Sequence, residues 1–203
     1  MENINTIIEI GSFSIKTIIY SNLDNNPKIE GIGKSNTQGY NGNEINSFDE
    51  FIDSIKRSIV QAEKQANIII KDCYVLFSNK SIKINKFKNS IALDGSIVEN
   101  NDLRKLSKVE IKSNDDYSQN LYISHYQIDN DLITENPLGI SCNKLSMISL
   151  ISMIDKKQIN IINNIFQKLK IKIINFIDST TSYFFYLKNK KISKKNLILI
   201  DFG

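Results

Sequence analysis

The residues best placed to do chemistry lie between two short apolar runs near the N-terminus. The first run, Thr6–Glu9, ends in a carboxylate, and a glycine and a hydroxyl-rich turn follow it at Gly11 and Ser12-Phe13-Ser14. Glycine lets a backbone approach a ligand closely, and turn amides and hydroxyls can donate to a phosphate. A carboxylate can hold a metal ion through its water shell. The pattern is compatible with a phosphate-binding strand–turn–strand, and also with an ordinary hairpin that has glycine at its turn.

The last seven residues repeat this arrangement. Leu197–Ile200 is the apolar run, Asp201 is the acid, and Gly203 is the glycine. Two such hairpins facing each other resemble the phosphate-1 and phosphate-2 loops with which the actin, Hsp70 and sugar-kinase superfamily holds ATP. The resemblance implies that Glu9 and Asp201 serve the metal, Mg²⁺, and that the phosphate-binding residues are Gly11, Ser12, Phe13, Ser14, Asp201 and Gly203.

Composition indicates a globular chain that forms one domain or two small ones. The 203 residues are 41% hydrophobic and carry a net charge of +4. No basic stripe with interleaved aromatic residues occurs, so nucleic acid is not an expected partner. Cys73 and Cys142 lack a CxxC partner and are interpreted as reduced, buried thiols. Neither a signal-peptide pattern nor an apolar run of about 18 residues is present, which favours a cytoplasmic location.

The elements that position the two turns follow the order of an RNase H-like fold. Apolar spacing predicts a helix that starts after Ser47, which forms a capping box with Glu50. The pattern stops at Ser81 and resumes at Asp155. Strands are predicted over Thr6–Glu9, from Ile15, and over Lys28–Lys34, Asp72–Asn79, Lys170–Ile177 and Leu197–Phe202, and further helices over Asp155–Leu169 and Ser179–Leu187.

The stretch between these two points has a pattern of its own. It predicts a strand pair or bulged strand over Ser81–Leu93, a helix over Ile97–Ile111, and strands over Gln119–Asp129 and Asn143–Ile154. The predicted class is therefore α/β, an actin-like (RNase H-type) lobe with an inserted strand-helix-strand-strand (SHS2) subdomain. Residues 1–80 and 154–203 are expected to form a split subdomain 1A, and residues 81–153 a 1C-like insertion.

This insertion, with several short motifs in order, resembles the N-terminal half of the FtsA family of actin-like bacterial cell-division proteins. The matching positions are Gly31-Ile32-Gly33, Ser35, Gly39, Gly42, Ile45, Ala62-Glu63, Asp94-Gly95-Ser96-Ile97, Asp102, Tyr126–Asp129, Asn136-Pro137-Leu138-Gly139 and Thr181-Ser182-Tyr183.

The resemblance implies an ATP-binding scaffold that, in full length, tethers the FtsZ ring to the inner membrane. The implied partners are FtsZ and other divisome proteins, with self-association through the 1C-like insertion. The implied location is the cytoplasmic face of the inner membrane at the division site. The implied activity is at most a weak ATPase, and no residue is assigned as catalytic.

Some residues depart from the family pattern. Glu9 stands where Asp is usual, and Ser14 stands where Lys is usual. Lys16 gives a spacing closer to PilM, an actin-like pilus-assembly protein, so a PilM-like scaffold stays an alternative. A sugar-kinase-type phosphotransferase and a nucleotide-free interaction remnant are further alternatives. Asp178 is explained as a helix N-cap, and His125 is expected to be a packed core residue on the face of Leu121 and Ile123.

The sequence stops before a second lobe and an adenosine-binding motif, so it is expected to be a truncated N-terminal part. Membrane contact is expected only through a C-terminal segment beyond these residues. Nucleotide affinity in this fold sums contacts from two lobes, and each ~1.4 kcal/mol is tenfold in affinity. The 203 residues alone are therefore expected to bind Mg-ATP only weakly and to hydrolyse none.

Overall fold

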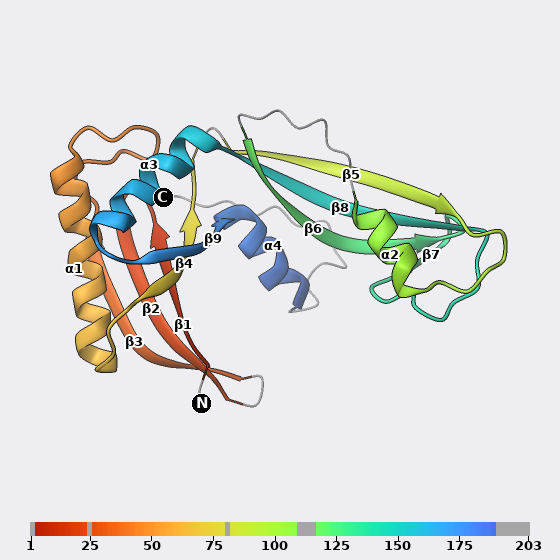
Figure 1. Cartoon of the computed structure of the whole chain (residues 1–203), viewed down its shortest axis with the longest axis horizontal. Coiled ribbons are helices and arrows are strands. Elements are labelled where there is room, and N and C mark those ends of the chain that lie inside the picture. The colour runs from red at the N-terminus through yellow and green to blue at the C-terminus, as the bar shows by residue number, and fades with distance from the viewer. Residues whose placement is uncertain (1–2, 24–25, 80–81, 109–116, 190–203) are drawn as a thin grey trace. The chain divides into compact units, whose positions relative to one another are not determined.

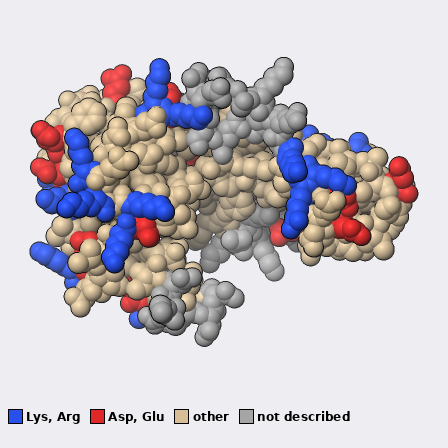
Figure 2. Space-filling view, viewed as in Figure 1, with Lys and Arg blue, Asp and Glu red and all other residues tan. Residues whose placement is uncertain are grey.

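The computed structural model describes residues 3–23, 26–79, 82–108 and 117–189 (Figure 1). The chain divides into two compact units. One comprises residues 1–82 and 157–203 and is called here the five-stranded unit; the other, residues 83–156, is called the insertion. Each has a sheet of its own, which confirms the predicted α/β class. On the face shown in Figure 2, basic and acidic side chains are interspersed over the described surface.

The sheet of the five-stranded unit has the order β3-β2-β1-β4-β9. Antiparallel pairing joins β1 to β2 and β2 to β3, whereas β1, β4 and β9 run parallel. Parallel pairing places the carboxyl ends of β1, β4 and β9 at one edge, where Ile10 pairs with Phe77 and Phe77 with Asp178. This is the arrangement of an RNase H-like sheet. The bounds are β1 Asn3–Ile10, β2 Ser14–Leu23, β3 Asn26–Asn36, β4 Asp72–Phe77 and β9 Lys172–Asp178.

Helix α1 (Phe48–Ala66) packs closely on β2 and β3 because small residues face it. Ser47 is its N-cap, as predicted, and its hydroxyl accepts from the N–H of Glu50 at 3.5 Å. A side chain at Gly33 would overlap the backbone of α1, and the buried hydroxyls of Thr17 and Ser58 are 2.5 Å apart. Two further helices, α3 (Lys156–Lys168) and α4 (Ser179–Asn189), flank β9 in the chain. Within the described ranges no helix is both long and apolar enough to cross a bilayer.

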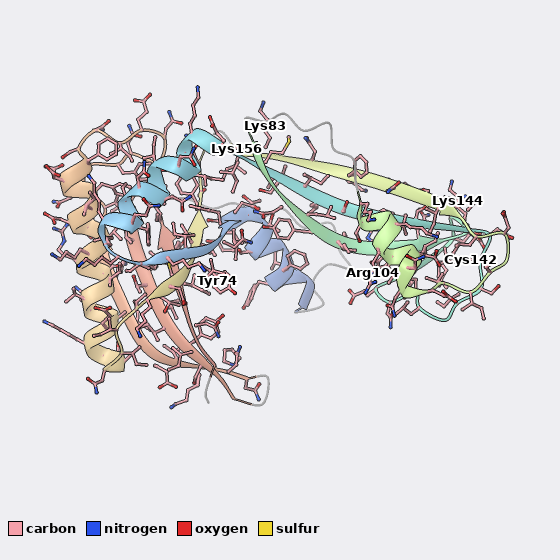
Figure 3. All side chains as sticks on the ribbon, viewed as in Figure 1. Tyr74, Lys83, Arg104, Cys142, Lys144 and Lys156 are labelled. Carbon is pink, nitrogen blue, oxygen red and sulfur yellow. The ribbon has the colours of Figure 1, made fainter. Side chains whose placement is uncertain are left out.

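The insertion is a four-stranded antiparallel sheet of order β5-β8-β6-β7 with helix α2 packed against it. Its core gathers apolar side chains from the sheet, the helix and the loops. The insertion begins at Lys83 and ends at Lys156, and these residues lie near each other because Lys83 pairs with Met153 (Figure 3). The bounds are β5 Lys83–Ala92, α2 Asn100–Ser107, β6 Tyr117–Ile128, β7 Leu132–Thr134 and β8 Lys144–Asp155, and the core residues are Val98, Leu106, Tyr126, Ile128, Cys142, Leu145 and Met147.

Several sequence predictions for the insertion are wrong in detail. The stretch predicted as a strand pair or bulged strand is one strand, β5, whose register against β8 is unbroken. Helix α2 is shorter than predicted, because the side chain of Asp102 accepts from the N–H of Glu99 and starts the helix there. The short strand β7 was not predicted. Asp155, predicted as the first residue of a helix, is the last residue of β8, and α3 begins at the next residue, Lys156.

His125 does not share a face with Leu121 and Ile123, contrary to the prediction. The register of β6 against β8 shifts between Ile123 and His125, which moves the following side chains to the opposite face. A one-residue shift has this effect because side chains alternate with a period of two. As a result Tyr126, and not His125, joins the core of the insertion.

Candidate phosphate-binding site

The turn between β1 and β2 is a tight hairpin held by its own backbone. The N–H of Gly11 donates to the carbonyl of Ser14 at 3.2 Å. A Cβ at Gly11 would lie 2.8 Å from that same oxygen, so the turn itself requires glycine. Thr37, just after β3, donates its N–H to the carbonyl of Phe13 at 3.0 Å and its hydroxyl to the carbonyl of Gly11 at 2.7 Å. The turn is thus fixed by its own backbone hydrogen bond and by the two hydrogen bonds from Thr37.

This clamp engages the carbonyl groups of the turn and leaves donors for a ligand. In the part of the chain that the structure describes, the N–H groups of Ser12 and Phe13 donate no hydrogen bond. Both residues are exposed, and Phe13 is 71% exposed. Successive N–H groups in a turn form a concave site for anions. The backbone arrangement therefore suits a phosphate, with the Ser12 hydroxyl as a third donor.

A loop after β3 packs against the tip of this hairpin. Gly42 has a φ of +88°, a conformation that favours glycine, and a Cβ there would lie 3.1 Å from the Cβ of Ser12. The side-chain oxygen of Asn41 accepts from the N–H groups of Asn43 at 3.0 Å and Glu44 at 2.8 Å, which fixes the loop. The loop therefore forms a second, ordered wall beside the turn.

The third wall comes from the carboxyl ends of the parallel strands. Ser78 and Asn79 follow β4, and Ser179 and Tyr183 belong to α4, which follows β9. Together with the hairpin and the Gly42 loop they enclose a pocket of about 450 Å³. In α/β sheets, ligands bind outside the carboxyl ends of the strands. The pocket has that position in the sheet.

Three charged side chains line this pocket, one from each of the antiparallel strands. Glu9 pairs in register with Lys16, and Lys16 pairs with Lys34. The Nζ of Lys16 lies 2.8 Å from Oε2 of Glu9, and the two side chains are 46% and 28% exposed. The backbone N–H of Lys34 donates to Oε1 of Gln61, at 2.9 Å, which ties this part of β3 to α1. Two ammonium groups and one carboxylate give the described lining a positive charge.

The described residues fit an anion better than they fit the magnesium ion that actin-like proteins usually bind with ATP. The Glu9 carboxylate, which the sequence suggested as a metal ligand, forms an ion pair with the ammonium of Lys16. Among the described residues no group of three or more His, Cys, Asp or Glu side chains is placed to hold a metal. Asp201 and Gly203 lie outside the described residues, so their roles stay predictions. The described lining thus offers Mg²⁺ one carboxylate, Glu9, which is paired with a lysine and is for that reason a poor metal ligand.

The structure also brings to the pocket residues that sequence reasoning did not assign to it. Lys34 could have been found from the cross-strand register, because the hairpin places it opposite Lys16. Ser78, Asn79 and Ser179 could have been found from their position just after parallel strands. Gly42 was noted only as a motif match, and its contact with Ser12 gives that match a physical reason.

Asp178 caps α4, as predicted. Its Oδ1 accepts from the N–H of Thr181 at 2.7 Å, and the residue is buried at the end of β9. Its other carboxylate oxygen has no hydrogen-bond partner within the described part of the chain. Nothing in this geometry assigns it a catalytic role.

The remaining candidates from the sequence are structural. His125 is half-buried, and its Nδ1 lies 3.0 Å from the hydroxyl of Ser124. Cys73 and Cys142 are free and buried, as predicted. Burial, with a smaller contribution from the charge of Asp72, raises the pKa of Cys73 to about 12. Burial also raises the pKa of Cys142. Neither thiol is a reactive nucleophile in this environment.

The sheet order, the hairpin at its carboxyl edge and the inserted second sheet define a lobe of the actin-like class. Among solved structures, the PilM-PilN type IV pilus biogenesis complex matches with a TM-score of 0.58 at 9% identity, over 92% of this chain and 50% of that one. At this identity the match shows the fold alone. No protein-family model matches the chain.

By sequence, the chain is similar to bacterial cell division proteins named FtsA. Cell division protein FtsA of Buchnera aphidicola subsp. Schizaphis graminum (strain Sg) is 27% identical over 202 residues, covering 97% of this chain and 48% of that protein. FtsA of Buchnera aphidicola subsp. Acyrthosiphon pisum (strain APS) is 29% identical over 139 residues, 66% of this chain and 33% of that protein. The chain is a distant homologue of FtsA over most of its length. It spans about half the length of the first of these relatives.

Proposed function

We propose that the pocket beside the β1–β2 hairpin binds the phosphate groups of a nucleotide, ATP. The observation that carries this proposal is the fixed turn whose Ser12 and Phe13 N–H groups make no hydrogen bond within the described part of the chain. The positive charge of the lining supports the proposal, because a cleft of one sign concentrates ligands of the opposite sign. The protein's own contribution is to bind and orient the phosphates.

We further propose that the chain forms the nucleotide-binding lobe of an FtsA-type scaffold for cell division. The similarity to FtsA over 97% of the chain supports this role. In this proposal the protein works at the cytoplasmic face of the inner membrane, with FtsZ and other divisome proteins as partners. Residues 1–80 and 154–203 then correspond to subdomain 1A, and the 1C-like insertion mediates self-association.

The phosphate proposal is tested by NMR titration of the ¹⁵N-labelled 203-residue chain with ATP or with inorganic tripolyphosphate. Saturable shifts at the amides of Ser12, Phe13 and Gly42 are expected at millimolar ligand. The insertion provides the internal control, because amides such as those of α2 should not move. Shifts that are absent up to tens of millimolar, or that are spread over the whole chain, would favour a nucleotide-free interaction remnant.

The cellular role is tested by depletion of the protein in its native cell. An FtsA-type scaffold predicts filaments without septa, because division stops while growth continues. The alternative is a PilM-like scaffold, which the position of Lys16 favours. That alternative predicts normal division with loss of surface pili. The two phenotypes separate the two functions whatever the state of the nucleotide pocket.

A further inference from the structure

The three charged side chains of the pocket form a row across neighbouring strands. Residues that pair across antiparallel strands share a face, so the register Glu9–Lys16–Lys34 places all three on one face of the sheet. Lys16 is central, with a carboxylate on one side and a second lysine on the other. The described pocket lining contains no other Asp, Glu, Lys, Arg or His.

The two lysines are not equivalent. Lys16 makes an ion pair with Glu9 at 2.8 Å, whereas the ammonium of Lys34 makes no ion pair or hydrogen bond among the described residues. Like charges directly opposite each other on antiparallel strands repel. An anion bound between Lys16 and Lys34 would remove this repulsion. The row is therefore arranged to gain from an anionic ligand.

We infer that Lys16 and Lys34, and not a divalent metal, neutralise the phosphates bound in this pocket, so that binding does not require Mg²⁺. The inference rests on the proposed function for the class of ligand, a nucleotide polyphosphate. It differs from that proposal because it says where the positive charge that balances the phosphates comes from, namely the two lysine side chains.

Electrostatics argue against a metal in the same place. A magnesium ion on the Glu9 carboxylate would have to share it with the Lys16 ammonium, which lies 2.8 Å from Oε2. It would also lie beside two positive side chains, and Mg²⁺ gives up its own water reluctantly. Free polyphosphate carries more negative charge than its magnesium complex. The pocket should therefore prefer the metal-free anion.

The test compares affinities with and without metal in the full 203-residue chain. ATP, tripolyphosphate and inorganic phosphate are titrated separately by NMR, once in EDTA and once in excess MgCl₂. The inference expects ATP and tripolyphosphate to bind in EDTA as tightly as in Mg²⁺, or more tightly. Binding that weakens tenfold or more when Mg²⁺ is removed would overturn the inference and leave the phosphate proposal intact. No binding under any condition would overturn both.

Substitutions in the row make the test specific. Lys34→Gln should weaken binding about five- to tenfold in both buffers, since it removes one partly exposed charge-assisted contact. Lys16→Gln should weaken binding in EDTA and make it respond to Mg²⁺, because the Glu9 carboxylate is then free. Lys28→Gln is the matched control, since Lys28 is also exposed on β3 but pairs with Glu30, at 3.2 Å.

Each outcome with these variants decides the matter. Circular dichroism first confirms that each variant is folded. If Lys16→Gln is unfolded, the test rests on Lys34→Gln, whose position is exposed. If Lys34→Gln binds like the wild type and like Lys28→Gln, Lys34 is no part of the site and the inference fails. If Lys16→Gln stays insensitive to Mg²⁺, removing the lysine has not opened Glu9 to a metal, and the inference that Lys16 takes the place of a metal fails.

Discussion

Replacing Gly33 by alanine should separate α1 from the sheet and destabilise the five-stranded unit. An added Cβ would lie 2.8 Å from the carbonyl carbon of Ser58 and 2.9 Å from the backbone nitrogen of Ala62, and closer still to the Ser58 carbonyl oxygen. Carbon atoms in contact are normally ~3.5–4 Å apart. Because the obstacle is helix backbone and not the end of a flexible side chain, α1 must move by about 1 Å or more.

The magnitude follows from the contacts that such a movement breaks. Thr17 and Ser58 share a hydrogen bond at 2.5 Å, and the side chains of Gln61 and Gln65 accept from N–H groups of β3, each at 2.9 Å. Three hydrogen bonds are worth about 1 kcal/mol each. Overpacking lowers the stability by a further roughly 1–3 kcal/mol. The lower entropy of the unfolded alanine chain offsets at most about 1 kcal/mol of this loss. The net loss is about 3–5 kcal/mol, a large part of a total of roughly 5–15 kcal/mol.

Urea unfolding followed by far-UV circular dichroism measures this loss. Gly139→Ala is the control: Gly139 has a φ of +81° but no neighbouring atom within 4 Å, so the alanine costs only backbone strain, about 1–2 kcal/mol. If Gly33→Ala unfolds within 1 kcal/mol of the wild type, α1 is not packed on β3 as described. The position of Lys34, which follows Gly33, would then also need revision.

Three further predictions concern the thiols, the insertion and the site. At pH 8, a pKa of about 12 leaves about one Cys73 in ten thousand as thiolate; Cys73 and Cys142 should react with Ellman's reagent only in urea, and fast reaction of the native chain would contradict this. The N–H of Glu99 lowers the pKa of Asp102, which therefore stabilises the fold above the usual carboxyl pKa and loses this effect as pH falls through the lowered value. Asp102→Asn should accordingly be less stable than wild type at pH 7 and converge with it once the pH falls below the lowered pKa of Asp102, and a constant difference would argue against the cap. Gly42→Ala should weaken polyphosphate binding several-fold by displacing the turn at Ser12, with a loss of stability of about 1–2 kcal/mol from backbone strain at its φ of +88°; unchanged affinity would show that this loop is not part of the site.

Much of the five-stranded unit could be predicted because its local signals agree with its packing. The cap at Ser47 and the apolar spacing after it predicted α1, which begins at Phe48. Gly31 and Gly33 appeared in the sequence only as a motif. The structure gives the reason, since a side chain at either position would meet the backbone of α1.

The residues of the candidate site could be found from the sequence only where they are adjacent in the chain. The turn from Gly11 to Ser14 lies between two apolar strands, so its residue types and spacing were sufficient. Lys34 reaches the same pocket through the pairing of β3 with β2, which no local pattern records. Glu9 was interpreted from its own chemistry, without its cross-strand partner Lys16, and that partner alters what the carboxylate can bind.

The insertion shows the other limit of sequence reasoning. The register shift between Ile123 and His125 adds one residue to β6, and an alternating pattern does not reveal where such a residue lies. Strand β7, Leu132–Thr134, is short and largely exposed, and therefore has no apolar periodicity to detect.

The insertion begins and ends on neighbouring strands, and this has an evolutionary consequence. Lys83 at the start of β5 pairs with Met153 near the end of β8, and opposed residues of antiparallel strands have Cα atoms about 5 Å apart. The chain thus leaves and re-enters the rest of the protein through two points that a few residues could bridge. A lineage could exchange, enlarge or lose the whole unit without changing the pairing of β4 with β9. Selection can therefore act on the surface of the insertion independently of the sheet that carries the β1–β2 turn.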